Sequence, residues 1–144
     1  MGDLQVREGA EQEAAPATAR RNTVQRALVL EAVRALCFHP TSDEVYNEVR
    51  KRHPSISRAT VYRNLRLLAD NGEVSRVEVT RGADRYDLTT APHYHARCRV
   101  CGRVFDVEMP YRADLPSCVT DAHGFLIEGH QILFEGLCPE CQRA

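Results

Sequence analysis

Two pairs of cysteines constrain the fold of this chain more than any other feature. The pairs are Cys98-x2-Cys101 and Cys138-x2-Cys141. Each has the spacing of a metal-binding knuckle, and together they supply the four thiolates of a tetrahedral structural zinc site. Two disulfides are the alternative, and they suit an oxidising compartment. Because the gap between the pairs is longer than in a minimal zinc ribbon, we expect a helix and strands to fold between them. The isolated Cys37 and Cys118 are expected in the core.

The composition is that of an ordinary globular protein. Of the 144 residues, 43% are hydrophobic and 27% are charged, and no apolar run approaches the roughly 20 residues that cross a bilayer. The N-terminus lacks the features of a secretory signal, so we expect a cytoplasmic protein with no membrane partner, in which zinc is favoured over disulfides. The net charge is -1, yet residues 20–85 carry an excess of Lys and Arg, as a nucleic-acid-binding half does.

The first half of the chain is predicted to form a winged helix-turn-helix domain over residues 20–88. Residues 1–19 contain few large apolar side chains and are expected to be a mobile tail. Thr41 and Glu44 form a capping box, and Ser57 is a second N-cap. Apolar periodicity and a Gly-containing turn complete the pattern. The predicted elements are helices over 21–36, 42–53 and 58–71 and a β-hairpin over 74–88.

The second half is predicted to be a small α+β domain over residues 93–144, so that the fold class of the whole chain is α+β. A proline-containing stretch without periodicity, residues 89–92, is interpreted as a hinge between the two domains. The predicted elements of the second domain are strands over 93–98 and 104–108, a helix over 115–122 and one or two strands over 125–137.

The predicted third helix has an outward face suited to DNA. A recognition helix enters the major groove by its N-terminal residues. Val61 and Leu65 point inward. The outward residues are Arg58, Ala59, Thr60, Tyr62 and Arg63. Arginine contacts guanine, threonine and alanine meet a thymine methyl, and tyrosine reaches phosphate. A solvated amphipathic helix is the alternative, but the two preceding helices and the basic hairpin favour double-stranded DNA as a partner.

A second group of metal-ligating residues contains no cysteine. His93 and His95 alternate on a predicted strand, so both imidazoles face the same side. The other candidates are His39, Asp87 and Asp106. A donor set of nitrogen and oxygen suits iron(II), manganese or zinc, although ordinary surface or core histidines are the alternative. Because the ligands come from both sides of the hinge, a bound metal would favour one arrangement of the two domains over another.

Five motifs spread over the chain match one known family. They are His39-Pro40-Thr41, Ser57 to Leu65 (SRATVYRNL), His93-Tyr94-His95, Cys98-x2-Cys101-Gly102 and Cys138-x2-Cys141. On these motifs the sequence resembles the ferric uptake regulator family, and most closely its peroxide-responsive branch. The resemblance extends from about Arg21 to Cys141.

The resemblance implies a homodimeric, metal-dependent transcriptional repressor rather than an enzyme, with residues 93–144 as the dimerisation domain. It places structural zinc on Cys98, Cys101, Cys138 and Cys141. It places regulatory iron(II) or manganese on His39, Asp87, His93, His95 and Asp106. In the peroxide branch, iron(II) in that site reacts with hydrogen peroxide, and a ligating histidine, here His39 or His93, is oxidised. Loss of the ligand opens the dimer and releases the operator DNA.

Two features favour the peroxide branch over the iron-uptake branch. Both carboxylate ligands, at 87 and 106, are Asp, where iron-uptake regulators more often carry Glu. Pro92 and Tyr94 also stand where many of those regulators have further ligands. His130 matches a position of that additional site, but its partners are missing. We therefore expect His130 to be structural.

Other functions are kept as alternatives. The first is an iron- or manganese-responsive uptake regulator whose site does not react usefully with peroxide. Arg63 resembles the recognition helix of the iron-uptake type, so the resemblance does not fix the operator. A zinc-uptake sensor is disfavoured because no additional sulfur ligand lies near residues 93–95. A metallohydrolase is disfavoured because no Glu stands as a general base beside the His-x-His pair. A purely structural zinc-binding module does not explain the capped third helix and its arginines.

Overall fold

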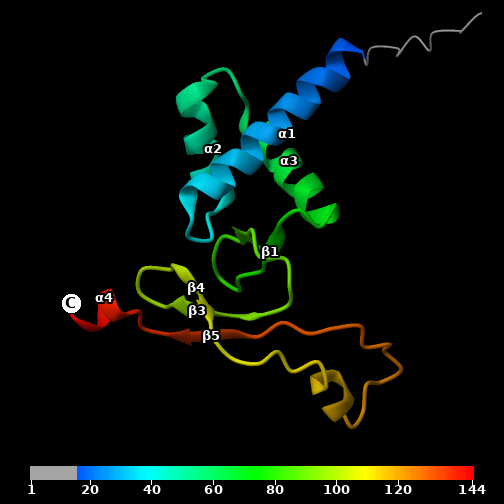
Figure 1. Ribbon diagram of the computed structural model, residues 1–144. Coiled ribbons are helices and arrows are strands. Elements are labelled where there is room, and N and C mark those ends of the chain that lie inside the picture. The colour runs from blue at the N-terminus through cyan, green and yellow to red at the C-terminus, as the bar shows by residue number, and fades with distance from the viewer. Residues whose placement is uncertain (1–15) are drawn as a thin grey trace, which may run out of the picture.

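The computed structural model describes residues 16–144. Three helices lie above a three-stranded sheet, and a two-stranded hairpin lies between them (Figure 1). The helices are α1 (Ala17–Leu36), α2 (Ser42–Arg52), α3 (Arg58–Asp70) and α4 (Pro139–Gln142), with a 3₁₀ turn η1 (Leu115–Cys118). The strands are β1 (Ser75–Val77), β2 (Arg85–Asp87), β3 (Tyr94–Cys98), β4 (Val104–Val107) and β5 (Leu133–Gly136). This is the predicted α+β architecture, with three helices followed by a hairpin.

Helix α1 begins four residues earlier than predicted. It begins at Ala17, directly after Pro16, and not at Arg21. Proline fits this position because the first amide groups of a helix have no partner within it. Residues 17–19, which were assigned to the mobile tail, therefore belong to α1. Residues 1–15 of that predicted tail lie outside the described residues.

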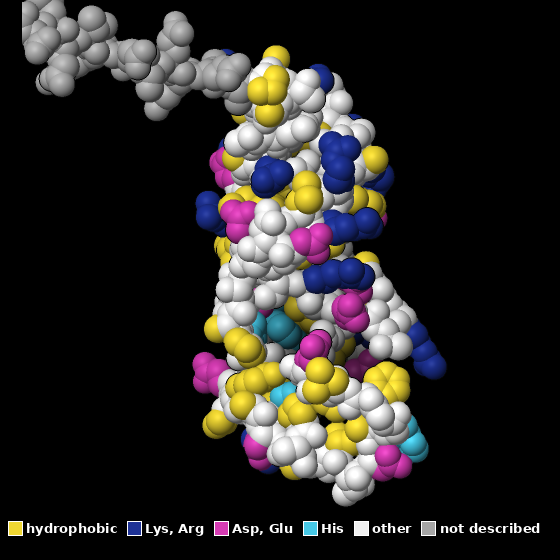
Figure 2. All heavy atoms as spheres, turned by 90° about the vertical axis from the view of Figure 1, so that its right-hand side faces the viewer, with side chains coloured by type: hydrophobic (Ala, Val, Ile, Leu, Met, Phe, Trp, Pro, Cys, Tyr) yellow, Lys and Arg dark blue, Asp and Glu magenta, His cyan; other side chains and the backbone are white. Residues whose placement is uncertain are grey.

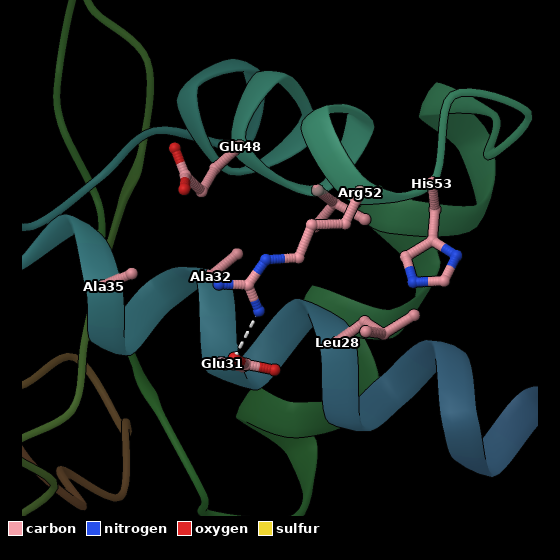
Figure 3. Close-up of a pocket in the computed structure, with 8 residues that line it drawn as sticks. Leu28, Glu31, Ala32, Ala35, Glu48, Arg52 and His53 are labelled. Carbon is pink, nitrogen blue, oxygen red and sulfur yellow. Dashed lines mark hydrogen bonds and ion pairs between the residues drawn. The ribbon is translucent and has the colours of Figure 1, made fainter.

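The three N-terminal helices enclose one apolar core. The core side chains include Val29 and Val33 of α1, Val45 and Val49 of α2, and Val61, Leu65 and Leu68 of α3. Their spacing of three or four residues puts them on one face of each helix. At the surface, Arg52 of α2 reaches Glu31 of α1 at 2.6 Å, with Leu28 and Ala32 beside the pair (Figure 3).

Both predicted helix caps are confirmed. The Glu44 amide donates to Thr41 Oγ1 at 3.2 Å, and Glu44 Oε2 accepts from the Thr41 amide at 2.8 Å, which is a complete capping box. The Ser57 hydroxyl accepts from the Thr60 amide at 3.1 Å and caps α3. These caps fix where α2 and α3 begin, and α3 is the predicted recognition helix.

The hairpin is antiparallel and shorter than predicted. Ser75 pairs with Asp87 and Val77 pairs with Arg85. A single bridge also joins Arg85 to Thr41, so the hairpin is attached to the start of α2. The chain reaches β3 a few residues after Asp87.

The lower sheet has the strand order β4-β3-β5. Strands β3 and β4 are antiparallel, with His95 opposite Asp106, and β5 runs parallel to β3, with Cys98 opposite Gly136. The helix predicted over 115–122 is wrong: only the 3₁₀ turn η1 forms there. Pro116 lacks an amide donor, and η1 buries no residue, so no packed apolar face stabilises a longer helix. Within 125–137, one strand forms, β5.

The prediction that Cys37 and Cys118 are core residues is wrong. Both are exposed. Cys37 follows the last turn of α1 with a left-handed backbone (φ 54°), and its thiol faces the Arg34 carbonyl. Cys118 lies in η1, which packs no side chain into a core.

The hairpin packs on the lower sheet. Val77 and Val79 form a small apolar cluster with Val104 of β4, against which Leu133 of β5 packs. The Gln131 side chain donates to the Glu78 carbonyl at 2.9 Å. Through the hairpin, these contacts join the helical part, which consists of α1, α2 and α3, to the sheet. None of the helices within residues 16–144 is both long and apolar enough to cross a bilayer.

Candidate metal centres and nucleic-acid interface

The four paired cysteines converge at one end of the lower sheet. Their sulfur atoms lie within 4.8 Å of one another. Cys98 ends β3 and Cys101 follows in the turn, where Gly102 has φ 75° and its amide donates to the Cys98 carbonyl at 2.9 Å. Because β5 lies beside β3, the second pair, at the start of α4, reaches the first. The strand pairing thus explains how two distant pairs form one cluster.

The surroundings of the cluster favour thiolates. Backbone amides of Cys138, Cys101 and Val100 face the Cys98 sulfur and lower the pKa of that thiol to about 5. The Arg103 guanidinium, 3.5 Å from Cys101 Sγ, lowers the pKa of the Cys101 thiol. Sequence reasoning missed Arg103, although it directly follows the Cys-x2-Cys-Gly motif.

The Cys141 thiol is made less acidic by its surroundings. Hydrogen bonding to the Cys138 sulfur, together with burial and the other neighbouring sulfurs, raises the pKa of the Cys141 thiol to about 12. Four thiolates in one cluster therefore require a cation to offset their repulsion. The sulfur donor set and its tight grouping fit zinc.

The histidines and aspartates form a second cluster between the helical part and the sheet. His39 lies in the turn between α1 and α2, and Asp87 ends β2. The remaining members are His93 just before β3, His95 in β3 and Asp106 in β4. One ligand atom from each of the five residues lies within 4.8 Å of the others. The structure therefore brings all five predicted residues together.

The Nε2 atoms of the three histidines converge on the two carboxylates. Asp87 Oδ2 lies 3.2 Å from His39, 2.9 Å from His93 and 3.1 Å from His95. Asp106 Oδ1 lies 2.9, 3.0 and 3.3 Å from the same three atoms. Three imidazole nitrogens and two carboxylate oxygens around one point fit a divalent cation such as iron(II) or manganese.

Backbone groups form hydrogen bonds with the candidate ligands on the side away from the cluster. The Ala91 carbonyl lies 2.7 Å from His93 Nδ1 and accepts its proton, which leaves Nε2 free as a ligand. The Thr89 amide donates to Asp87 Oδ1 at 2.8 Å and leaves Oδ2 for the cluster. The segment predicted as a hinge thus supplies outer hydrogen bonds to two candidate ligands.

The charges of this cluster stabilise one another. Burial alone would raise the pKa of Asp87, but hydrogen bonds from His39, His95 and the Thr89 amide hold it well below its usual range. Burial alone would lower the pKa of His39, but Asp87 and Asp106 raise it. An imidazolium and a cation therefore compete for the same pair of carboxylates.

His39 has an unusual backbone conformation. Its φ is 44°, in the left-handed region, and it precedes Pro40. Residues other than glycine rarely adopt this region, and a following proline disfavours compact conformations. Such a residue typically costs about 1–3 kcal/mol and persists where its surroundings hold it.

His130 belongs to a different arrangement. Its Nε2 lies 2.8 Å from the Tyr94 hydroxyl, and its ring stacks on Tyr111 with centroids 4.9 Å apart. Neither group of metal-ligating residues found within residues 16–144 includes His130.

Four of the five residues predicted on the outward face of α3 are exposed. Arg58, Ala59, Tyr62 and Arg63 are exposed and Thr60 is half-buried, whereas Val61 and Leu65 are buried. In Figure 2, Lys and Arg side chains gather over the helical part, while hydrophobic side chains are more frequent in the lower part. On this face most of the basic side chains thus lie in the half that holds the predicted recognition helix.

Asp43 in the first turn of α2 occupies part of this face. Its Oδ1 accepts hydrogen bonds from Arg58 and Tyr62, and the Arg58 guanidinium lies 4.5 Å from the centroid of the Tyr46 ring. Sequence reasoning missed Asp43, because its contact with α3 depends on how the two helices pack.

Comparisons with known proteins agree with one another. Residues 17–135 match the model of the ferric uptake regulator family. The peroxide operon regulator of Bacillus subtilis (strain 168) is 33% identical over 126 residues, which cover 88% of this chain and 87% of the relative. The peroxide-responsive repressor of Staphylococcus aureus (strain USA300) is 34% identical over 122 residues, covering 85% and 82%.

Two solved structures have a similar fold. The peroxide stress regulator of Campylobacter jejuni superposes with a TM-score of 0.67 at 30% identity, covering 86% of this chain and 93% of that one. The ferric uptake regulator of Helicobacter pylori, described as having three functional metal-binding sites, superposes with a TM-score of 0.68 at 22% identity, covering 88% of each chain. At that identity the second likeness concerns the fold alone.

Proposed function

Because the chain belongs to the ferric uptake regulator family, we propose that it is a metal-dependent transcriptional repressor that binds operator DNA and is inactivated by peroxide. The observation that carries the proposal is the convergence of five ligand groups on one point. His39 comes from the turn between α1 and α2, Asp87 comes from strand β2 of the hairpin, and the other three groups come from the sheet region. A cation held by all five stabilises the arrangement in which the two parts are joined.

The two centres have different proposed roles. Zinc on Cys98, Cys101, Cys138 and Cys141 stabilises the lower sheet, since the cluster ties β3, the following turn and α4 together. Iron(II) or manganese on His39, Asp87, His93, His95 and Asp106 controls the arrangement of the DNA-binding part. Only the second site draws ligands from both parts, so it is the proposed sensor.

The proposed partner of α3 is the major groove of double-stranded DNA. Arg58, Ala59, Thr60, Tyr62 and Arg63 are the proposed reading residues. The exposure of Arg58, Ala59, Tyr62 and Arg63 beside the Ser57 cap supports this role, because a helix that enters the groove presents its first turns.

A second copy of this chain is the proposed protein partner. Large apolar side chains are exposed in the C-terminal part: Phe125 is 76% exposed, Leu126 84% and Phe134 44%. Phe134 lies in β5, an edge strand of the sheet. Exposed apolar side chains beside an open strand edge support a homodimer formed by this half.

Peroxide sensing is proposed to act on the histidine ligands. Iron(II) in the site supplies the redox chemistry that cleaves the O–O bond of hydrogen peroxide. One oxygen atom is added to a ring carbon of His39 or His93, the other leaves as water, and the imidazole is oxidised by two electrons. The oxidised ring is a weaker ligand, so the two parts separate and DNA is released. The peroxide-responsive relatives support this proposal.

Mass spectrometry after a peroxide pulse tests the proposal. The protein is loaded anaerobically with iron(II), treated briefly with hydrogen peroxide, and its peptides containing His39 and His93 are analysed. We expect one added oxygen on either residue, and none in a manganese-loaded control. His123, which is exposed and belongs to neither cluster, is an internal control for unspecific oxidation.

DNA binding completes the test, with duplexes selected from a random library by the manganese-loaded protein as the probe. We expect binding that needs added metal and is lost after iron and peroxide together. If neither histidine is oxidised while binding still needs metal, the chain is an iron- or manganese-responsive uptake regulator, a function that the resemblance of Arg63 to that type also favours. DNA binding that does not depend on added metal would contradict both the peroxide sensor and the uptake regulator.

A further inference from the structure

Arg85 joins three segments that are far apart in the sequence. It lies in β2, and its side chain is only 12% exposed. Its Nη1 donates to the His39 carbonyl at 3.2 Å, and its Nη2 donates to the Gly102 carbonyl at 3.1 Å. Glu44 Oε2, which also caps α2, lies 3.6 Å from Nη1. A largely buried guanidinium thus has acceptors from the helical part and from the turn over residues 98–102, which carries Cys98 and Cys101 and is called the thiolate knuckle below.

Strand β2 holds His39 at both its backbone and its imidazole. Arg85 and Asp87 are two residues apart on the strand, so their side chains lie on the same face. Asp87 Oδ2 contacts His39 Nε2, while Arg85 binds the carbonyl of the same residue. The Tyr86 amide donates to the Pro40 carbonyl at 3.0 Å and fixes the next residue.

The backbone of His39 needs such support. A left-handed φ of 44° before a proline is unfavourable for a residue with a side chain. Without the hydrogen bond to its carbonyl, the turn is free to relax toward an extended conformation. That relaxation would move the imidazole away from the two carboxylates.

The second acceptor connects the other metal centre. Gly102 follows Cys101 in the knuckle, and its own left-handed φ of 75° places its carbonyl toward Arg85. Strand β4 begins two residues later and carries Asp106. One planar guanidinium therefore sets the position of the knuckle relative to the turn that carries His39.

We propose that Arg85 is a positioning residue for the His and Asp centre: it holds the His39 backbone and fastens it to the thiolate knuckle. The inference rests on the proposed function in so far as His39 is a metal ligand there. Without Arg85, fewer molecules have all five ligands assembled before metal binds. The apparent metal affinity falls by the same factor, whereas the occupied site keeps all its ligands.

The experiment compares Arg85→Met with the unchanged chain, each full-length and zinc-loaded. Manganese affinity is measured by electron paramagnetic resonance of the free ion, and affinity for the selected duplex is measured at saturating manganese. We expect manganese binding to weaken about tenfold or more, with DNA affinity restored at saturation. Arg85→Lys keeps the charge but loses the planar guanidinium that donates to two carbonyls at once. Its manganese affinity is therefore expected to lie between those of the unchanged chain and Arg85→Met.

The matched control is Arg52→Met. It removes an arginine that joins α1 to α2 within the helical part and does not reach the sheet. Its manganese affinity is expected to stay unchanged. Equal manganese affinities for Arg85→Met and the unchanged chain, with zinc retained in both, would overturn the inference. Absence of a second metal-binding event in the unchanged chain would instead contradict the proposed function.

A second readout needs no regulatory metal. In the zinc-loaded protein, amide hydrogen exchange of Tyr86, whose amide donates to the Pro40 carbonyl, reports on the His39–Pro40 turn. We expect faster exchange in Arg85→Met and unchanged exchange in Arg52→Met. Unchanged Tyr86 exchange in Arg85→Met would show that the turn is held without Arg85 and would also overturn the inference.

Discussion

The Nε2 atom of His39 lies 2.9 Å from Oδ1 of Asp106, although the two residues are 67 positions apart. His39 belongs to the turn between α1 and α2, and Asp106 belongs to β4 of the lower sheet. The pair therefore exists only while the helical part rests against the sheet. A ligand that binds both residues stabilises that arrangement, and loss of either residue as a ligand weakens it.

Asp87→Ala is expected to abolish metal-dependent DNA binding while the zinc content is retained. Asp87 Oδ2 contacts all three histidines, so its loss removes the group that gathers them. The measurement is affinity for the selected duplex with and without manganese, with zinc determined in parallel. Asp114→Ala, which removes an exposed partner of Arg112, is the matched control. A variant at position 87 that still responds to manganese would exclude Asp87 from the ligand set.

Cys98→Ser is expected to release zinc and unfold the lower sheet. Cys98 is buried and ends β3, and backbone amides lower the pKa of its thiol to about 5. Zinc in a structural site contributes directly to the free energy of folding. The three thiolates that remain in the variant are not expected to hold the zinc ion. Zinc content and circular dichroism check this. Cys118→Ser, at an exposed cysteine outside the cluster, should match the unchanged chain. A folded, zinc-free Cys98→Ser protein would contradict the structural role.

Those two centres differ in how far the sequence predicts them. The thiolate cluster follows from two local spacings, since each Cys-x2-Cys pair forms its half of the site within one turn. His93 and His95 follow from alternation on a strand. The place of Asp106 depends on the pairing of β4 with β3, where it stands opposite His95. The sequence predicts the two strands and offers Asp106 as a candidate, but their register is a tertiary property that only the structure gives.

The features that sequence reasoning missed or mistook depend on packing. Arg85 and Asp43 have ordinary surroundings in the sequence, and their partners come from other elements. The helix expected over 115–122 fails because Pro116 lacks an amide donor and no side chain of this segment is buried in a core. Local pattern therefore predicts the elements, while the contacts between elements decide which side chains are functional.

Arg63→Ala is expected to weaken operator binding by about 1–3 kcal/mol if the guanidinium makes a bidentate base contact. Arg63 is exposed on α3. Fluorescence anisotropy with the selected duplex measures the loss, and duplexes changed at one base pair show whether specificity is relaxed. Arg112→Ala, an exposed arginine of the C-terminal part, is the control. Unchanged affinity and specificity would remove Arg63 from the reading residues.

Asp43→Asn is expected to strengthen binding to unselected duplex DNA several-fold. The Asp43 carboxylate holds Arg58 and Tyr62 and places a negative charge beside them, so it competes with phosphate for the same donors. Anisotropy over a series of salt concentrations measures the effect. Asp70→Asn makes the same charge change at the end of α3. Equal gains in DNA affinity for both variants would show that the effect comes from the loss of one negative charge anywhere on this face and not from the release of Arg58.

The pH dependence of stability is expected to reverse when manganese is added. His39 has a raised pKa because the opposing effect of burial is outweighed by Asp87 and Asp106. Its contribution to the free energy of unfolding is therefore full below the unfolded pKa of about 6.5 and is lost as the pH rises through the higher folded value. The lowered pKa of Asp87 acts oppositely: its contribution is present above about pH 3.9 and is lost only as the pH falls toward the folded value.

In zinc-loaded protein without manganese, the unfolding temperature should therefore fall as the pH rises above about 6.5. With manganese it should rise over the same range, because metal binding displaces protons from the imidazoles. Differential scanning fluorimetry of both forms measures this, and His39→Gln should flatten the slope of the manganese-free form. If that slope is the same in His39→Gln and the unchanged chain, protonation of His39 does not stabilise the metal-free cluster. The two carboxylates would then be neutralised by another group, and competition between proton and metal at His39 would be excluded.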